Sequence, residues 1–402
     1  MIERAQAVAL AQRALIHLEQ GTTDQAHDIL RVPVSDYLDA GLWHEEIDRV
    51  FKRVPLMAAL TAELPRPGDY KAVDMLGVPL LLSRGRDGLV RAFLNVCRHR
   101  GAQLCPAGTG TRHRFRCPYH AWVYDDRGAL VAVHRPHTFG DVEAGDFGLR
   151  PLPAAERHGF VWVRLTGAEP IDLDAWLGEE YGTELARLDL AAWHVYEQRE
   201  LPGPGWKVAY DGYLENYHVQ ALHRTTFAPT NTSNLMVVDA FGPHQRILYP
   251  SKSLASLRDV PESEWDPAAH CGTVYTFFPN VSIAGTWDGH AVVSQILPGP
   301  TPGQSRTIQT VLTREPCESE AERAYLAEFS ELLRRGVLEE DYRTGAQVQA
   351  ALGSGANTHF VFGRNELALQ HHHRSLKALL GHDTAKPEEA VRELVDTPRT
   401  AD

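Results

Sequence analysis

Cysteine, long apolar runs and positive charge are all in short supply in this sequence. Its five cysteines among 402 residues are a sparse, odd-numbered set, which excludes a disulfide-stapled scaffold and predicts a reducing, cytoplasmic compartment. The longest apolar runs, such as residues 77–82, are far shorter than the roughly 18 residues of a membrane span. The first 20 residues lack the basic start and unbroken apolar stretch of a secretory signal. We therefore expect neither a membrane span nor a membrane partner.

The charge balance and the missing phosphate-binding loops exclude further classes of partner. Forty Lys and Arg residues stand against 52 Asp and Glu residues, and the net charge of -12 disfavours nucleic acid. No G-x-G-x-x-G follows a strand pattern and no G-x-x-x-x-G-K-[ST] occurs, so no bound dinucleotide or P-loop nucleotide is expected. The remaining composition, 43% hydrophobic and 23% charged, is that of a globular chain with two or three domains.

The hydrophobic periodicity changes twice along the chain. Residues 1–62 are predicted to be mostly helical, including 46–60, before a Pro/Gly break at 63–70. From 70 to 166, short segments separated by Gly-containing turns predict a small antiparallel β domain. The remainder predicts an α+β arrangement. Its expected helices are 173–188, 208–223, 319–352 and 365–380, and its expected strands are 194–201, 273–285, 290–297 and 306–314.

The clearest chemical signal lies in residues 95–122. Cys97-x-His99 is followed after 17 residues by Cys117-x2-His120. A [2Fe–2S] cluster with two Cys on one iron and two His on the other draws one Cys and one His from each of two loops. Structural zinc also takes two Cys and two His, but its usual spacing places both Cys in one knuckle, and it remains the alternative. Arg98, Arg100 and Gly101 are expected around the cluster.

A second set of ligand types lies in the following region. Asp211, Glu215 and His218 share one face of the predicted helix, and His223 comes near them only if that helix bends. Two imidazoles and a carboxylate on one side of Fe(II) leave positions for O₂ and substrate. Asp341 is the best candidate for the distant carboxylate, with Glu340 as the runner-up and Glu339 weaker. Asp211 is a candidate outer partner of His218 or His223.

The motif C-R-H-R-G…C-P-Y-H-A-W resembles the Rieske domain of ring-hydroxylating and related non-haem iron oxygenases, and E-N-Y-H-x4-H resembles their catalytic domain. The resemblance covers most of residues 40–380. It implies a small all-β Rieske domain and a helix-grip (Bet v1-like) catalytic domain with an antiparallel sheet and long C-terminal helices. The expected divisions are 1–40, an N-terminal helical segment packing on the catalytic domain; 41–166, the Rieske domain; and 167–402, the catalytic domain.

The resemblance also implies the cofactors and the activity. Cys97, His99, Cys117 and His120 would hold the [2Fe–2S] cluster, and His218, His223 and Asp341 would hold a mononuclear Fe(II). The chain would be the terminal oxygenase component, an EC 1.14-class oxidoreductase. It would use O₂ and electrons from a separate NAD(P)H reductase, perhaps with a ferredoxin, to mono- or dihydroxylate an aromatic or other hydrophobic small molecule, as in aromatic hydrocarbon catabolism. The alternatives are oxidation of a quaternary amine or N-/O-demethylation, and, more distantly, a Rieske electron carrier without oxygen chemistry.

The resemblance implies a head-to-tail homotrimer, in which Glu215 is expected to link His218 to the Rieske His120 of a neighbouring subunit. Glu215 and Asp211 are therefore both expected to be catalytic residues. The sequence departs from the family pattern at two positions. Ala121 replaces a frequent Gly, and Glu215 replaces the Asp of most ring-dihydroxylating members and resembles the quaternary-ammonium oxygenases.

Other conspicuous residues carry weaker expectations. His371, His372 and His373 lie in one predicted helix, so they point in different directions and are not expected to share a metal. His134, His137 and His158 are expected at the surface or between domains. The apolar set Tyr275, Phe277, Phe278, Val281 and Ile283 either lines a pocket or belongs to the core.

Overall fold

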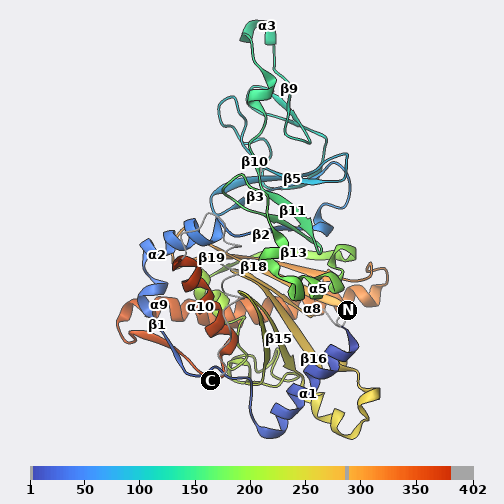
Figure 1. Ribbon diagram of the computed structural model, residues 1–402, viewed down its shortest axis with the longest axis vertical. Coiled ribbons are helices and arrows are strands. Elements are labelled where there is room, and N and C mark those ends of the chain that lie inside the picture. The colour runs from blue at the N-terminus through green and yellow to red at the C-terminus, as the bar shows by residue number, and fades with distance from the viewer. Residues whose placement is uncertain (1–2, 286–288, 382–402) are drawn as a thin grey trace.

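The computed structural model describes residues 3–285 and 289–381, and it has two parts (Figure 1). A narrow part made of short strands protrudes from a larger part that combines helices with a long antiparallel sheet. The α+β fold class is thereby confirmed.

Two small antiparallel sheets form the protruding part. A five-stranded sheet has the order β10-β5-β4-β3-β6, and a three-stranded sheet has the order β7-β8-β9. Their strands are β3 (Asp69–Met75), β4 (Val78–Arg84), β5 (Val90–Leu94), β6 (Gly108–Thr111), β7 (Arg114–Arg116), β8 (Val123–Asp125), β9 (Leu130–Ala132) and β10 (Pro151–Leu152), with the short helix α3 (Pro136–Phe139) after β9. These strands enclose a separate hydrophobic core that includes Phe115, Trp122, Tyr124 and the two motif cysteines. The stiff sheets therefore carry both Cys–His loops.

A third sheet connects the two parts and corrects the prediction for the N-terminal region. Residues 46–60 were expected to form one helix, but helix ends at Phe51 and β2 (Leu56–Leu60) pairs with β12 (Phe160–Val163), which in turn pairs with β11 (Ala154–Arg157). Pro55 has no N–H to donate and disfavours helix at the residue before it, so the chain turns to extended structure there. Leu56–Leu60 and Phe160–Val163 are fully buried, and they join the hydrophobic core of the larger part.

A seven-stranded antiparallel sheet with the order β13-β19-β18-β17-β16-β15-β14 forms the centre of the larger part. All four strand segments expected from sequence lie in it, although residues 273–285 form two strands with a turn between them instead of one. The strands are β13 (His194–Gly203), β14 (Val237–Phe241), β15 (His244–Pro250), β16 (Cys271–Phe277), β17 (Val281–Ala284), β18 (His290–Pro298) and β19 (Ser305–Thr313). The five apolar residues from Tyr275 to Ile283 belong to the core.

Helices cover both faces of this sheet. On one face, α6 (Trp206–Asp211) contacts β18 and β19, and α10 (Leu367–Gly381) contacts β14 and β15. On the other face, α1 (Arg4–Gln20) packs on β14 and β15, with Ala11 and Ala14 fully buried against Val237 and Leu248. The other helices are α2 (Ala40–Glu45), α4 (Leu173–Leu177), α5 (Glu179–Leu188), α7 (Val219–Leu222), α8 (Glu320–Arg334) and α9 (Tyr342–Ala351), and the two-stranded sheet pairs β1 (Leu30–Pro33) with β20 (His359–Phe362).

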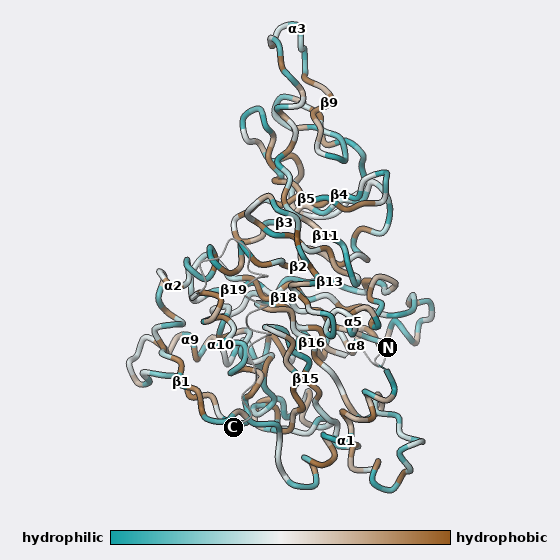
Figure 2. Tube along the Cα trace, viewed as in Figure 1, coloured by the Kyte–Doolittle hydropathy of each residue, from teal (hydrophilic) through white to brown (hydrophobic). Residues whose placement is uncertain are grey.

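The distribution of hydropathy follows this layering, with hydrophobic segments along the strands and hydrophilic segments along the outer loops (Figure 2). Among the helices that the structure describes, none combines the length and the apolar character needed to cross a bilayer.

Candidate functional site

The two histidines of the H-x4-H motif flank a helix of one turn. The prediction of one continuous helix over 208–223 is wrong, because α6 ends at Asp211 and helix resumes only in α7 (Val219–Leu222). His218 is the N-terminal flanking residue of α7 and His223 is the C-terminal one. Five positions on a regular helix would separate the rings by about 140° around the axis. Since the helix stops at His223, the two rings converge, and their centroids lie 5.0 Å apart.

The distant acidic residues come from a π-helical segment. Residues Arg335–Asp341 form this segment between α8 and α9. A π-helical turn changes the direction of the side chains that follow it, and such turns are frequent at functional sites. Here it places two consecutive acids, Glu340 and Asp341, on different sides of the His223 ring.

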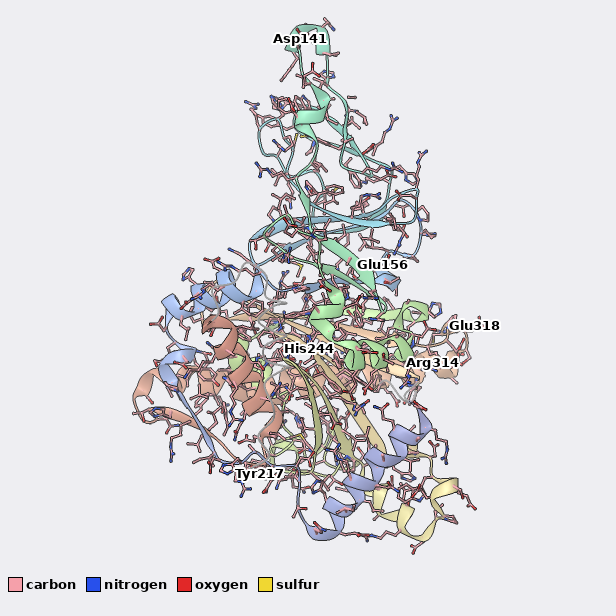
Figure 3. The ribbon with its side chains drawn as sticks, viewed as in Figure 1. Asp141, Glu156, Tyr217, His244, Arg314 and Glu318 are labelled. Atoms are coloured by element: carbon pink, nitrogen blue, oxygen red, sulfur yellow. The ribbon has the colours of Figure 1, made fainter. Side chains whose placement is uncertain are left out.

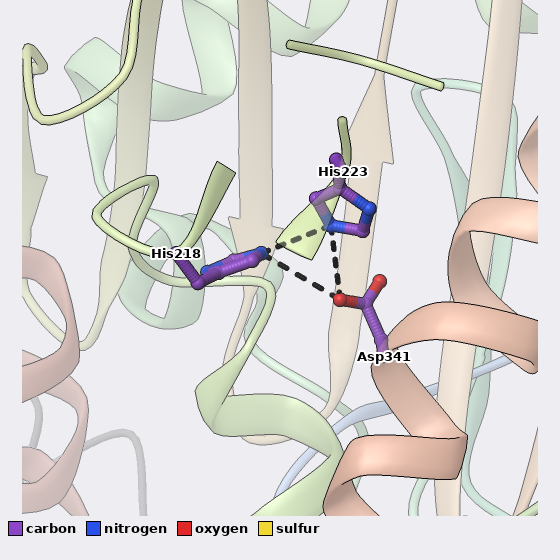
Figure 4. A group of neighbouring side chains, drawn as sticks. All are labelled: His218, His223 and Asp341. Carbon is purple, nitrogen blue, oxygen red and sulfur yellow. Dashed lines mark hydrogen bonds and ion pairs between the residues drawn. The ribbon is translucent and has the colours of Figure 1, made fainter. Parts of the chain in front are cut away.

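Three donor atoms converge between these elements (Figure 4). The Nε2 atoms of His218 and His223 are 3.1 Å apart, and Asp341 Oδ1 lies 3.6 Å from the first and 3.0 Å from the second. Metal bonds to nitrogen and oxygen in such sites are about 2.0–2.2 Å long, so donors around one ion must lie within about 4.4 Å of each other. These three residues satisfy that condition. Among the described residues, they are the group of His, Cys, Asp or Glu side chains whose ligand atoms lie close enough together to hold one metal ion. Two imidazoles and one carboxylate are the donor set of a facial-triad iron site.

Each histidine also contacts a carboxylate through its other nitrogen. His218 Nδ1 bonds to Glu215, whose second oxygen accepts from the backbone N–H of His218 at 3.2 Å. His223 Nδ1 lies 2.6 Å from Glu340 Oε2, which also accepts from the hydroxyl of Thr226 at 2.6 Å. Such contacts fix the tautomer and leave each Nε2 available to a metal.

The electrostatics of His223 favour a cation at this point. Burial lowers the pKa of His223, but Asp341 and Glu340 outweigh that effect and raise the pKa above its ordinary value. The ring is only 2% exposed, so water does little to screen it from these two carboxylates. A metal ion placed among the three donors would meet the same negative charge.

Glu340, Glu339 and Asp211, the other acidic candidates, do not join the three converging donor atoms. Glu340 occupies the outer side of His223, and Glu339 pairs with Arg334 at 2.6 Å. Asp211 was expected beside His218 or His223, but its carboxylate accepts from Tyr37 at 2.6 Å and lies 2.8 Å from His373 Nε2. Asp211 is the last residue of α6, so the break in the helix separates it from the face that it was expected to share.

A cavity of about 200 Å³ opens beside the triad. Its lining is mainly apolar and includes Phe227, Met236, Ile247, Leu333 and Val337. His218, His223, Asp341 and Glu215 form part of the same wall. The three donor atoms therefore face a space of small-molecule size.

The Cys–His loops form two similar turns in the protruding part. Gly101 N donates to Cys97 O at 2.9 Å, and Ala121 N donates to Cys117 O at 3.1 Å. Both turns end in left-handed backbone, with φ of +77° at Gly101 and +59° at Ala121. The frequent family Gly at position 121 thus has a conformational reason, and the Ala here bears a cost of about 1–2 kcal/mol.

The four motif side chains gather where these turns meet. His99 and His120 pack edge to face with centroids 4.5 Å apart, and Cys97 and Cys117 are each 2% exposed. Burial raises the pKa of the Cys97 thiol, and the adjacent Cys117 contributes in the same direction. His99 Nδ1 is buried without a hydrogen-bond partner, as expected of an atom that ligates a metal. These residues fit a [2Fe–2S] cluster held by two thiolates and two imidazoles.

Supporting residues that the sequence pattern did not reveal surround these turns. The Tyr124 hydroxyl lies 3.4 Å from Cys97 Sγ and accepts from Arg98 N at 2.9 Å. The fully buried Asn95 braces the first loop, because its side chain donates to Cys105 O and accepts from Cys105 N. All five cysteines are free thiols, so hydrogen bonds rather than a disulfide hold this loop. Asn95 begins the motif region and Tyr124 lies two residues beyond its end, but only the fold shows what they contact.

The three consecutive histidines of α10, His371, His372 and His373, do not form a shared site. His371 Nε2 contacts Gly242 O at 2.8 Å, His373 contacts Asp211, and His372 is buried among aromatic rings. Burial holds the pKa of His372 well below its ordinary value. Within α10 the three rings therefore point in different directions, as expected.

Two family models match the chain in the regions that contain these two sites. One is the Rieske [2Fe–2S] domain, over residues 54–143, and the other is the ring hydroxylating alpha subunit (catalytic domain), over residues 190–382. The chain thus contains a Rieske domain and a catalytic domain that binds mononuclear iron, and the zinc alternative is set aside.

The curated relatives of this chain have different enzymatic activities. The chain is 30% identical over 227 residues to a glycine betaine monooxygenase oxygenase subunit of Chromohalobacter salexigens, covering 53% of this chain and 49% of the relative. It is 34% identical over 144 residues to the biphenyl 2,3-dioxygenase subunit alpha of Rhodococcus jostii, covering 36% and 31% respectively. The chain therefore aligns with about half or less of the length of these relatives.

Solved structures share the whole fold at low identity. The quaternary ammonium Rieske monooxygenase CntA superposes with a TM-score of 0.74 and 19% identity, over 87% of this chain and 95% of that one. Naphthalene 1,2-dioxygenase from a Rhodococcus species superposes with a TM-score of 0.68 and 18% identity, over 94% and 99%.

Proposed function

Because this chain belongs to the Rieske non-haem iron oxygenase alpha subunits, we propose that it is the terminal oxygenase of a multicomponent system that hydroxylates an uncharged, hydrophobic organic substrate. The observation that carries this proposal is the convergence of His218 Nε2, His223 Nε2 and Asp341 Oδ1 on the wall of an apolar cavity. An electron carrier would have no use for such a cavity.

Two separate sets of side chains would bind the two metal centres. Cys97, His99, Cys117 and His120 would hold the cluster, and His218, His223 and Asp341 the iron. When bound, the cluster accepts and passes on single electrons, and Fe(II) activates O₂ for attack on the substrate. Glu215 and Glu340 keep the two iron-binding imidazoles oriented, and the apolar wall excludes water from the space beside them.

The composition of the cavity favours a neutral substrate. Among the described residues that line it, the acidic ones are Glu215 and Asp341, both assigned to the metal site, and none is Lys or Arg. A substrate carboxylate would find no Lys or Arg side chain among these lining residues to compensate its desolvation. Aromatic compounds and other neutral hydrophobic molecules suit the apolar lining better.

We further propose a head-to-tail homotrimer that pairs the sites of neighbouring chains. Figure 3 labels Tyr217, which precedes His218, near the lower edge of the larger part, while the protruding part with Asp141 lies at the opposite end of the long axis. This separation supports electron transfer between chains. In that arrangement Glu215 would accept a hydrogen bond from His120 of the partner subunit. The electrons would come from a separate NAD(P)H reductase, with or without a ferredoxin.

A second candidate function is oxidation of a quaternary amine. The similarity to glycine betaine monooxygenase and to CntA favours it, as does Glu215 in place of Asp. Tyr213, Phe227 and Tyr249 also line the cavity, and aromatic rings attract quaternary ammonium groups. The lack of a lining Lys or Arg argues against the carboxylated members of that class.

The proposal is tested with the full chain, loaded with both metal centres and supplied with NADH and a surrogate reductase under ¹⁸O₂. Neutral aromatic hydrocarbons and ketones are compared with glycine betaine and choline, and products are analysed by mass spectrometry. We expect one or two labelled oxygens in products from the neutral compounds, and none when Asp341→Ala replaces the wild type. Formaldehyde from the amines alone would establish the second candidate. Two irons per chain instead of three, with no labelled product, would leave only an electron carrier.

A further inference from the structure

Polar side chains form a row across one wall of the cavity. In the antiparallel register, Ser282 of β17 is paired with Ser294 of β18, and Ser294 is paired with Gln309 of β19. Directly paired residues point to the same face of a sheet, and all three line the cavity. The neighbouring row of paired residues, Val274 of β16, Ala284 of β17 and Val292 of β18, is apolar and also lines the cavity. The wall thus has an apolar stripe beside a stripe of hydrogen-bonding groups.

The carboxamide of Gln309 has a defined orientation. Arg199, its partner on the edge strand β13, donates from Nε at 2.9 Å and from Nη2 at 2.6 Å to Gln309 Oε1. A guanidinium offers only donors, so the atom that it contacts must be the carboxamide oxygen. Arg199 thus holds the oxygen end of the carboxamide, and the NH₂ end is the donor that Gln309 can offer to the cavity it lines.

Arg199 is itself held in place. Its Nη1 donates to Ser330 Oγ at 2.9 Å and lies 3.3 Å from Glu197 Oε2, and its Nη2 donates to the Ser330 carbonyl at 2.7 Å. These contacts come from β13 and α8, two elements that do not form the metal site. The orientation of Gln309 is therefore built into the scaffold before any substrate binds.

We propose that Gln309, with Ser294 and Ser282 beside it, is the specificity-determining donor group of this cavity. It recognises a carbonyl or hydroxyl oxygen on an otherwise apolar, uncharged substrate. The inference rests on the proposed function, since it names the substrate class of that same site. A hydrocarbon without an oxygen leaves the Gln309 amide unpaired when it displaces water, whereas an oxygenated compound of the same shape satisfies it. Arg199 acts as a positioning residue through Gln309.

Two compounds of nearly equal shape, 1-indanone and indane, separate the effect of the oxygen from that of the apolar surface. Their dissociation constants are measured by equilibrium dialysis on the holoenzyme, kept anaerobic and without reductant. One neutral hydrogen bond corresponds to about a 3- to 10-fold preference for the ketone. Gln309→Glu preserves the contact with Arg199 but replaces the NH₂ donor by an acceptor oxygen. We expect it to abolish that preference and to change the binding of indane less than about twofold.

Gln309→Leu is the second variant, in case the new carboxylate perturbs folding, and it should also remove the preference for the ketone. Thr310→Val is the matched control, because this next residue of β19 bonds to Gln198 on the other face of the sheet. Arg199→Lys should keep more of the preference than Arg199→Met, since Lys can still donate to the Gln309 oxygen. An effect of general destabilisation would weaken the binding of both compounds together.

Equal loss of indane and 1-indanone binding in the Gln309 variants, no change in either, or no binding of either compound to the wild type would overturn the inference. Failure of the proposed function gives a different result. A ketone preference that depends on Gln309 without any ¹⁸O incorporation would leave the binding inference standing and remove the oxygenase. Labelled products without a ketone preference would support the oxygenase and overturn the inference about Gln309.

Discussion

His223 directs its Nδ1 at the carboxylate of Glu340, 2.6 Å away. The contact occupies one ring nitrogen and leaves Nε2 facing the other two donors of the triad. Glu340 is adjacent in sequence to the proposed ligand Asp341, and the π-helical turn lets the two consecutive acids serve different atoms of one imidazole. The roles of the two acids, Glu340 and Asp341, can therefore be tested separately by substitution.

Replacing Glu340 with Ala should weaken iron binding by about 10- to 100-fold, because the His223 ring loses the contact that fixes its tautomer. Iron content after dialysis against graded chelator concentrations measures the effect. Glu339→Ala is the matched control, since Glu339 precedes Glu340 in the same segment but pairs with Arg334. Equal iron retention in the two variants would contradict the role given to Glu340.

Glu215→Gln should leave both metal centres bound while turnover falls by about 10-fold or more. The substitution removes the carboxylate charge that we propose to lie between His218 and the partner subunit's His120 but keeps the size of the side chain. Iron content, the spectrum of the reduced cluster and the rate of product formation are measured on the same preparation. Glu366→Gln is a useful comparison, because Glu366 lines a neighbouring hollow with Glu215. Unchanged turnover in Glu215→Gln would remove the bridging role.

Tyr124→Phe should lower the reduction potential of the cluster by about 20–60 mV, the equivalent of one hydrogen bond in a one-electron couple. A cluster cysteine is a thiolate, so the Tyr124 hydroxyl must be the donor to Cys97, and hydrogen bonds to sulfur stabilise the reduced state. A redox titration followed by electron paramagnetic resonance measures the shift. Tyr70→Phe, which removes a hydroxyl that bonds to Arg112 in the same domain, should leave the potential unchanged.

His244 should make the larger part lose stability as the pH falls below neutrality. The ring lies in the interior (Figure 3), where Nε2 donates to Trp176 O at 3.0 Å and Nδ1 accepts from Phe278 N at 3.1 Å. Burial lowers the pKa of His244 to about 3. The unfolded chain protonates this residue below about pH 6.5. Its contribution is therefore complete above that pH and is lost as the pH falls from about 6.5 toward 3.

Urea-unfolding free energies of wild type and His244→Gln test this dependence. Between pH 7 and pH 5 the wild type should lose about 2 kcal/mol more than the variant, because it has one additional proton to take up on unfolding. The substitution of the exposed His27 by Gln should leave the wild-type pH profile unchanged. Parallel profiles for wild type and His244→Gln would show that His244 does not govern this loss.

The sequence already contained the ligand types and most of the regular structure. The alternating Cys–His spacing predicted the cluster because thiolate and imidazole chemistry resides in residue identity. Strand and helix periodicities predicted the segments that form β13 and β16–β19 of the central sheet, but not β14 and β15, and they predicted the long helices near the C-terminus, since burial of one face leaves a repeating pattern. Periodicity failed where tertiary pairing overrode it, as in Leu56–Leu60, which became a strand against Phe160–Val163.

Only the tertiary structure decided how the individual side chains of the site are used. Local spacing could not distinguish Asp341 from Glu340, because the π-helical turn and the break after Asp211 change directions that a regular helix would impose. It could not orient Gln309 either, since that depends on the register of β13 against β19. Residue identity determines which atoms can bind a metal or donate a hydrogen bond. Contacts between segments more than 100 positions apart determine which of those atoms face one another.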